Sequence, residues 1–357
     1  MLEAPRIGDL PSGALDSIAD VAGVRVGHCT LAQGAVQTGV TVIRTDAQDP
    51  FLHKTPAGLA VINGLGKSAG LVQLQELGVL ESPIALTNTF AVGTIATALT
   101  RAAVAANPEI GRQLPTVNPL VLECNDGYLN DLQAFAVAEA HYAQAYAACS
   151  PDFAQGAVGA GRGMSCFGLK GGIGSASRIA STRAGRFTLG ALVLANFGRP
   201  DALILAGRAI GPVLAQRLQA GPPVAERGSI IMLLATDAPL DARQLRRLAL
   251  RAGAGLARTG SDFGHGSGDI ALAFSTAYTV PQLDAGSLHP QALLHESALD
   301  PLFAAAAQAT EQAIVHALFA AETVLGRDGY ARTAIKDIAP DWRTLMSHEV
   351  STRICTA

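Results

Sequence analysis

Two adjacent residues, Gly228 and Ser229, have the clearest chemical use in this sequence. They join a loop with prolines and charges, residues 221–227, to the unbroken apolar segment 230–235, which is typical of a buried strand. Because glycine has no Cβ, a hydroxyl group can approach its carbonyl closely, attack it and cut the chain. Ser229 would then be a new N-terminus whose amine can activate its own hydroxyl. The alternative is that the two residues form an ordinary turn.

A second serine and a carboxylate, Ser267 and Asp269, precede the apolar segment 270–276. Alternate residues of a strand share a face, so this hydroxyl could relay a proton while the carboxylate orients it or holds a substrate ammonium group. A polar turn would explain the same spacing. His265 is close in sequence, but it stands where the G-x-S-x-G motif requires glycine, and we interpret it as a surface or core residue.

Three further polar residues follow apolar strands. Asn196 ends the segment 187–195 and could donate its amide hydrogen to an oxyanion, or simply end the strand in a turn. Glu123 lies near the end of an apolar segment, and a buried carboxylate needs a partner. It therefore either pairs with an arginine or receives a cationic group of a substrate. Tyr128 could add a hydroxyl nearby.

Composition and motif spacing argue against several classes of protein. The net charge is −3 without basic blocks, so we expect no nucleic-acid partner. The glycine-rich segment 156–174 has Met164 where a dinucleotide fingerprint needs its third glycine. The eight histidines and five cysteines form no metal-binding pattern, so we predict neither cofactor nor metal. The sequence has no apolar run of about 18 residues and no signal pattern, which predicts a cytoplasmic protein without a membrane partner.

The elements that must position these residues are strands and long, separate helices. The chain has 357 residues, of which 49% are hydrophobic and only 15% charged, so we expect a large core and buried subunit contacts. Strands outnumber those of a simple β-α series, which favours sheets stacked between helix layers over a doubly wound fold. The predicted strands are 57–64, 118–124, 187–198, 229–235 and 270–276, and the predicted helices are 67–78, 91–106, 131–148, 241–258 and 300–325.

Together these segments resemble the self-processing serine aminopeptidases, a family that includes L-aminopeptidase/D-amidase and the β-peptidyl aminopeptidases. The resemblance covers nearly the whole chain, in the expected order. It is carried by DSIADVAGVRVGHCT at 16–30, PIALTNTFAVG at 83–93, ECNDGYLND at 123–131, GAGRGMSCFGLKGGIG at 159–174, LANFG at 194–198, RGSIIMLLATDAPL at 227–240, GSGDIALAFST at 266–276 and AAETVLGRDG at 320–329.

The resemblance implies a single α/β domain, 1–357, folded as a four-layer α-β-β-α sandwich that is similar to the N-terminal-nucleophile hydrolases but has a different connectivity. It implies self-cleavage into an α chain, 1–228, and a β chain, 229–357, which assemble as a homo-oligomer of αβ units, a tetramer or larger. The implied roles are cleavage at Gly228–Ser229, nucleophile at Ser229, supporting groups at Ser267 and Asp269, oxyanion donor at Asn196, and substrate contacts at Glu123 and Tyr128.

The implied activity is release of N-terminal α-L-, α-D- or β-amino acids from short peptides, amides or esters through an acyl-serine intermediate. An acyltransferase with the same nucleophile, or a binding protein with an uncleaved Gly-Ser turn, are the alternatives. Two residues depart from the family pattern: Arg162 replaces a small polar residue, and His316 replaces an amide side chain. Either difference could alter the pocket or the assembly.

Overall fold

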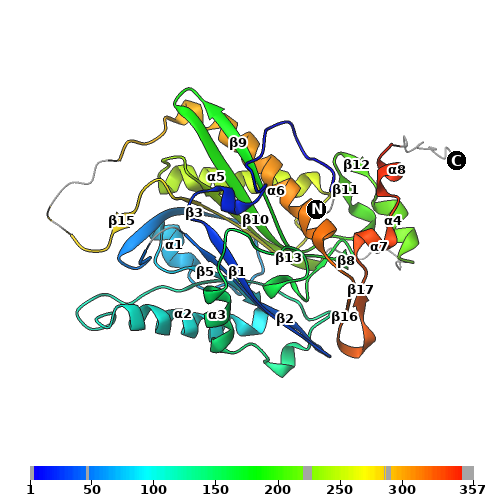
Figure 1. Cartoon of the computed structure of the whole chain (residues 1–357), viewed down its shortest axis with the longest axis horizontal. Helices are drawn as coiled ribbons and strands as arrows, with labels where there is room; N and C mark the ends of the chain where they lie inside the picture. The colour runs from blue at the N-terminus through cyan, green and yellow to red at the C-terminus, as the bar shows by residue number, and fades with distance from the viewer. Residues whose placement is uncertain (1–3, 46–47, 220–226, 285, 287–290, 348–357) are drawn as a thin grey trace.

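The computed structural model of this protein describes residues 4–45, 48–219, 227–284, 286 and 291–347. Most of the loop predicted at 221–227, as well as Cys355, lies outside the described residues. Two β-sheets dominate the fold (Figure 1).

The larger, seven-stranded sheet carries the segment that contains Ser229. Its strand order is β15 (Val280–Pro281), β3 (His53–Gly64), β14 (Gly266–Ser275), β13 (Arg227–Thr236), β10 (Gly185–Asn196) and β9 (Gly172–Thr182), with β4 (Val79–Leu80) paired to β3. β13 is thus an interior strand, antiparallel to β10 and parallel to β14. Its apolar run is buried on both faces, as the unbroken pattern of the sequence predicted.

The smaller sheet has four strands in the order β1 (Arg25–Gln33), β2 (Val36–Arg44), β5 (Ile84–Asn88) and β6 (Leu120–Cys124). One hydrophobic cluster lies between the two sheets and joins Ile43 and Leu122 of the smaller sheet to Ile231 and Leu272 of the larger one. The two sheets therefore pack face to face and share a core.

Helices cover the outer face of each sheet (Figure 1). Helices α5 (Ala242–Arg258) and α6 (Asp300–Ala320) pack on the larger sheet through a second hydrophobic cluster. Helices α2 (Val92–Ala106) and α3 (Glu139–Ala147) pack on the smaller sheet through a third. The order helix, sheet, sheet, helix confirms the predicted four-layer α-β-β-α sandwich.

Short elements complete the chain. The short helices are α1 (Leu71–Leu77), α4 (Gly211–Arg217), α7 (Ile335–Ile338) and α8 (Trp342–Ser347), and the short strands are β7 (Ser165–Cys166), β8 (Leu169–Lys170), β11 (Ile204–Leu205), β12 (Arg208–Ala209), β16 (Val324–Leu325) and β17 (Ala331–Arg332).

Two predicted helices differ from the structure. The predicted helix 131–148 is interrupted: Asp131 caps only a 3-10 turn, and Phe135 then takes a left-handed conformation (φ 45°), so that α3 begins at Glu139. The predicted helix 300–325 ends at Ala320, because Ala321 is extended and leads the chain into β16. No proline or glycine marks this end in the sequence.

The segment Thr89–Ala106, which includes α2, has the length and apolar composition of a membrane-spanning helix. The sequence analysis did not predict this. Only 28% of the segment is buried inside the protein, with Ile95 and Leu99 turned toward the smaller sheet. Because core helices of water-soluble proteins pass the same criterion, this segment is only weak evidence for a membrane.

Candidate active site

Ser229 lies on β13 between two strands that each contribute to its surroundings. It is paired with Asn196 of β10 on one side and with Gly268 of β14 on the other. The Ser229 hydroxyl donates a hydrogen bond to the carbonyl oxygen of Gly228 at 2.6 Å, and it accepts one from the Gly268 amide at 3.1 Å. The hydroxyl is therefore held against the carbonyl group of the preceding residue, on a rigid strand.

The structure explains why residue 228 is glycine. Its φ of +153° is rarely adopted by residues with side chains, and a Cβ there would lie 2.2 Å from the backbone oxygen of Asn196. Close contact between β10 and β13 thus excludes any side chain at the residue whose carbonyl faces Ser229. This backbone geometry goes beyond an ordinary loop-to-strand turn.

Ser267 and Asp269 form a buried pair on β14. The Ser267 hydroxyl donates to a carboxylate oxygen of Asp269 at 2.5 Å, and their exposed fractions are 0% and 1%. The parallel register sets Ser267 beside Gly228 and Asp269 beside Ile230, so the pair flanks the Gly228–Ser229 bond. The prediction that the two side chains point the same way is confirmed.

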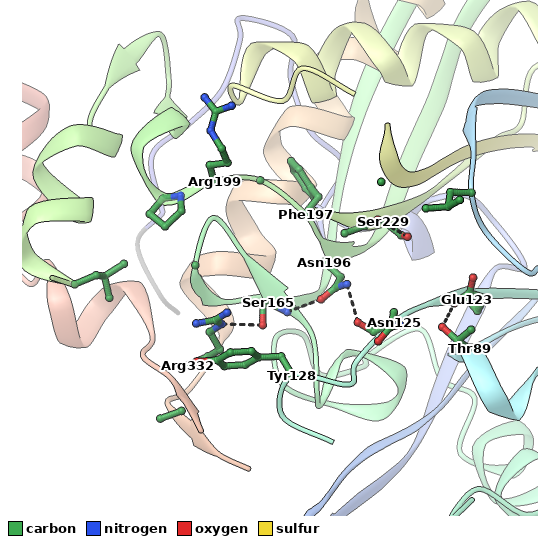
Figure 2. A pocket seen from close by; sticks show the side chains of 18 of the residues that line it. Thr89, Glu123, Asn125, Tyr128, Ser165, Asn196, Phe197, Arg199, Ser229 and Arg332 are labelled. Carbon is green, nitrogen blue, oxygen red and sulfur yellow. Dashed lines mark hydrogen bonds between the residues drawn. The ribbon is translucent and has the colours of Figure 1, made fainter. Parts of the chain in front are cut away.

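Asn196 is the last residue of β10 and lies directly opposite Ser229, which puts the two side chains on the same face. Its side-chain oxygen accepts a hydrogen bond from the Ser165 amide at 2.8 Å, and its Nδ2 donates to the carbonyl of Asn125 at 2.9 Å. Both bonds fix the orientation of the amide group (Figure 2). Since Nδ2 carries two hydrogens, one of them is left to face the cavity.

Glu123 is buried at the end of β6, with an exposed fraction of 2%. One carboxylate oxygen accepts a hydrogen bond from the backbone amide of Lys67 at 2.8 Å, and the other accepts one from the Thr89 hydroxyl. Within the described part of the chain, no arginine forms an ion pair with Glu123. The arginine alternative therefore has no support among the described residues, and the carboxylate keeps lone pairs for a cationic ligand.

A cavity of about 1000 Å³ opens beside Ser229. Ser229, Asn196, Glu123 and Tyr128 all line it, as Figure 2 shows for the labelled side chains. Of the predicted site residues, Ser267 and Asp269 are not among those that line the cavity, so this pair on β14 lies away from the cavity wall.

Tyr128 is partly exposed, and its neighbours were not predicted. Its ring stacks on Tyr330, and the guanidinium carbon of Arg332 lies 3.5 Å from the ring centre. Sequence reasoning also missed the other cavity residues Lys67, Thr89 and Ser165. These residues come from separate loops and short strands, and no local spacing in the sequence indicates that they meet.

The two departures from the family pattern lie outside the residues that line the cavity. Arg162 donates to Gln37 at 2.7 Å and forms an ion pair with Glu322 at 2.8 Å. His316 donates from Nδ1 to the carbonyl of Ser175 at 2.6 Å, and burial lowers its pKa. Both side chains have structural partners, so neither difference changes the wall of the cavity directly.

Comparison with known proteins identifies the family. The model of peptidase family S58 matches residues 16–332. The chain is 38% identical to the β-peptidyl aminopeptidase BapA of Sphingosinicella microcystinivorans, over 92% of this chain and 89% of that protein. Its fold matches a Burkholderia sp. β-aminopeptidase with a TM-score of 0.87 and 40% identity, over 96% of this chain and 98% of the other.

The fold also matches the L-aminopeptidase D-Ala-esterase/amidase of Ochrobactrum anthropi, described as a variant of the Ntn-hydrolase fold. The TM-score is 0.86 and the identity 33%, over 96% of this chain and 98% of the other. The chain belongs to peptidase family S58. It is a serine aminopeptidase of the N-terminal-nucleophile type, and the alternative of a non-catalytic binding protein is set aside.

Gly268 provides a test of this geometry. A Cβ at residue 268 would lie 2.7 Å from the Gly66 amide nitrogen and 3.2 Å from Ser229 Oγ. We expect Gly268→Ala to displace the hydroxyl and to lower kcat at least tenfold, since about 1 Å of misplacement can cost up to about 100-fold. Steady-state kinetics on folded Gly268→Ala protein measure the change in kcat.

The matched control is Gly93→Ala in α2, where nothing lies within 4 Å of the new Cβ. This change should leave kcat unaltered and raise stability by about 0.5–1 kcal/mol. Equal kcat for Gly268→Ala and wild type would show that contact with residue 268 does not position the nucleophile.

Proposed function

We propose that the chain cuts itself between Gly228 and Ser229 and that the new N-terminal Ser229 is the nucleophile of the aminopeptidase. The observation that carries this proposal is the 2.6 Å contact between the Ser229 hydroxyl and the Gly228 carbonyl, on a strand held from both sides. Residues 1–228 and 229–357 would be the two products.

The self-cleavage is an N-to-O acyl shift. Ser229 Oγ attacks the carbonyl carbon of Gly228, its proton passes to the departing Ser229 nitrogen, and an ester replaces the amide. Water then hydrolyses the ester, which leaves a carboxylate on Gly228 and a free amine on Ser229. In the precursor the Ser229 nitrogen is an amide and cannot act as a base, so another group must assist. The Ser267–Asp269 pair, beside this bond in the parallel register, is the candidate.

In the mature enzyme the α-amine of Ser229 is a suitable base. Its reference pKa of about 7.7–8.0 leaves an appreciable neutral fraction near pH 7. The amine would take the proton of the hydroxyl as Ser229 attacks the substrate, and would deliver it to the leaving amine as the acyl-serine ester forms. Asn196 would donate its remaining Nδ2 hydrogen to the oxyanion of the tetrahedral intermediate.

Glu123 would bind the free amine of the substrate. Its buried carboxylate lines the same cavity as Ser229, and its two hydrogen-bond donors, Lys67 N and the Thr89 hydroxyl, fix it in place. An ammonium group would supply the charge partner that a buried carboxylate requires. The substrates would accordingly be short peptides, amides or esters with an unblocked N-terminal amino acid, in keeping with the names of the relatives.

We further propose a homo-oligomer of processed αβ units. Phe90 and Phe135 stack on each other at 5.5 Å while remaining 49% and 70% exposed, beside the largely open outer surface of α2. A second copy of the chain would remove these rings from water.

Light scattering should give at least four αβ units per particle, and Phe135→Ser should lower that number. A wild-type mass of a single unit would contradict the proposal.

The cytoplasmic location of the protein stays a prediction.

Self-cleavage is tested by intact mass analysis. Wild-type protein should yield two chains with the masses of 1–228 and 229–357, because the hydroxyl already contacts the bond. Ser229→Ala should remain one chain with the same fold. A wild-type chain that stays intact and folded after prolonged incubation would contradict the proposal of self-cleavage.

The role of Asn196 is tested by kinetics. A donor aimed at the oxyanion stabilises the transition state more than the bound substrate, so Asn196→Ala should lower kcat by about 10²–10³ with little change in KM. Asn196→Asp keeps the acceptor for the Ser165 amide but places charge near the oxyanion, and it should be at least as impaired. A raised KM with unchanged kcat would assign Asn196 to substrate binding instead.

A further inference from the structure

Arg332 is a partly buried cation in the wall of the catalytic cavity. It ends the short strand β17, and its Nε donates to the Ser165 hydroxyl at 3.0 Å. Its guanidinium group also lies over the Tyr128 ring at 3.5 Å. These two contacts hold the side chain in one position, the Tyr128 side chain also accepts a hydrogen bond from it, and further N–H donors of its five are left for a ligand.

The charge of Arg332 is not matched by a carboxylate in the described part of the chain. Among the residues that the structure describes, no carboxylate lies within ion-pair distance of it, and burial lowers its pKa. A second arginine of the cavity, Arg199, differs in this respect, because it lies 3.4 Å from Asp201 and 3.9 Å from Asp262. A half-buried guanidinium without a counter-ion is costly, and a bound anion would offset that cost.

Arg332 and the oxyanion residue are linked through Ser165. The Ser165 amide donates to Asn196 and the Ser165 hydroxyl accepts from Arg332, so the guanidinium has a fixed place relative to the reacting carbonyl. Glu123 and Arg332 lie on opposite sides of Asn196 (Figure 2). A substrate with its amine at Glu123 and its scissile carbonyl at Ser229 would extend its leaving group toward Arg332.

We propose that Arg332 binds a carboxylate on the leaving-group side of the scissile bond and so selects short peptides over uncharged amides. The proposal rests on the proposed function, in which Glu123 receives the amine. The carboxylate is either the free C-terminus of a dipeptide or an acidic side chain of its second residue. A guanidinium binds both in the same way, through parallel N–H donors.

The test compares matched substrates on processed enzyme. The β-Ala, L-Ala and D-Ala p-nitroanilides are first compared, and the residue whose p-nitroanilide is hydrolysed fastest becomes the N-terminal residue of every test substrate. The substrates below are named with β-Ala in that position. One arm compares β-Ala-Leu with β-Ala-Leu amide. The other compares β-Ala-Asp amide with β-Ala-Asn amide. In each arm the quantity measured is the ratio of kcat/KM for the charged substrate to kcat/KM for the neutral one.

In wild type we expect a ratio of about 10–100 in at least one arm, as for one charge-assisted hydrogen-bonded contact. Arg332→Met, which keeps an unbranched side chain but removes the charge and the N–H donors, should bring that ratio to about 1, and Arg332→Lys should retain part of it. The matched control Arg199→Met should leave the ratio near its wild-type value, because Arg199 already has carboxylate partners. The arm that responds identifies the source of the carboxylate.

Several outcomes overturn the proposal. A wild-type ratio near 1 in both arms would do so, as would a preference that survives in Arg332→Met or falls equally in Arg199→Met. Melting temperatures confirm that each variant is folded. Turnover of a p-nitroanilide without any carboxylate preference would leave the aminopeptidase function intact and remove only the role of Arg332. Absence of turnover on every substrate would instead contradict the proposed function.

Discussion

The pairing of β13 with a strand on each side is the constraint on which the whole site depends. Antiparallel pairing with β10 puts Asn196 opposite Ser229, and parallel pairing with β14 puts Gly268 opposite it. Ser229, the Asn196 amide and the Ser267–Asp269 pair therefore occupy three adjacent strands of one sheet. A slip of one residue in either register would turn Ser229 to the other face and separate it from the cavity. The apolar core on both faces of the sheet holds that register.

The charged groups of the site are arranged by depth. Asp269 lies with Ser267 away from the cavity wall, Glu123 lies in the cavity wall contributed by the smaller sheet, and Arg332 lies in the wall contributed by β17. Glu123 and Arg332 are both held by neutral partners: hydroxyls, a backbone amide or an aromatic ring. Neutral partners orient a charge without neutralising it. The charges of Glu123 and Arg332 thus remain available to a ligand, whereas an ion pair between them would cancel both.

Local signals in the sequence were sufficient for the interior of the larger sheet and much less so for the cavity. The apolar run 230–235 identified β13, and the predicted helix 67–78 contains α1, which ends at Gly78 in a left-handed conformation. The helix predicted at 131–148 failed because Phe135 takes a positive φ, which an aromatic residue rarely adopts and which the sequence does not indicate. Arg332 could not be found, because it is 204 positions from its partner Tyr128 (332 minus 128) and no periodicity connects them.

The same strand pairing would also govern the protein after cleavage. Breaking the Gly228–Ser229 bond would free an amine at the entrance of β13, where a loose chain end could move away from the substrate. The strand resists this, because Ser229 and the residues up to Thr236 are paired continuously with both β10 and β14. The Gly268 amide also holds the Ser229 hydroxyl directly. The pairings of β13 with β10 and β14 that position the Ser229 hydroxyl for attack on its own chain would therefore also hold Ser229 for attack on a substrate. One serine could in this way serve as the nucleophile of both reactions.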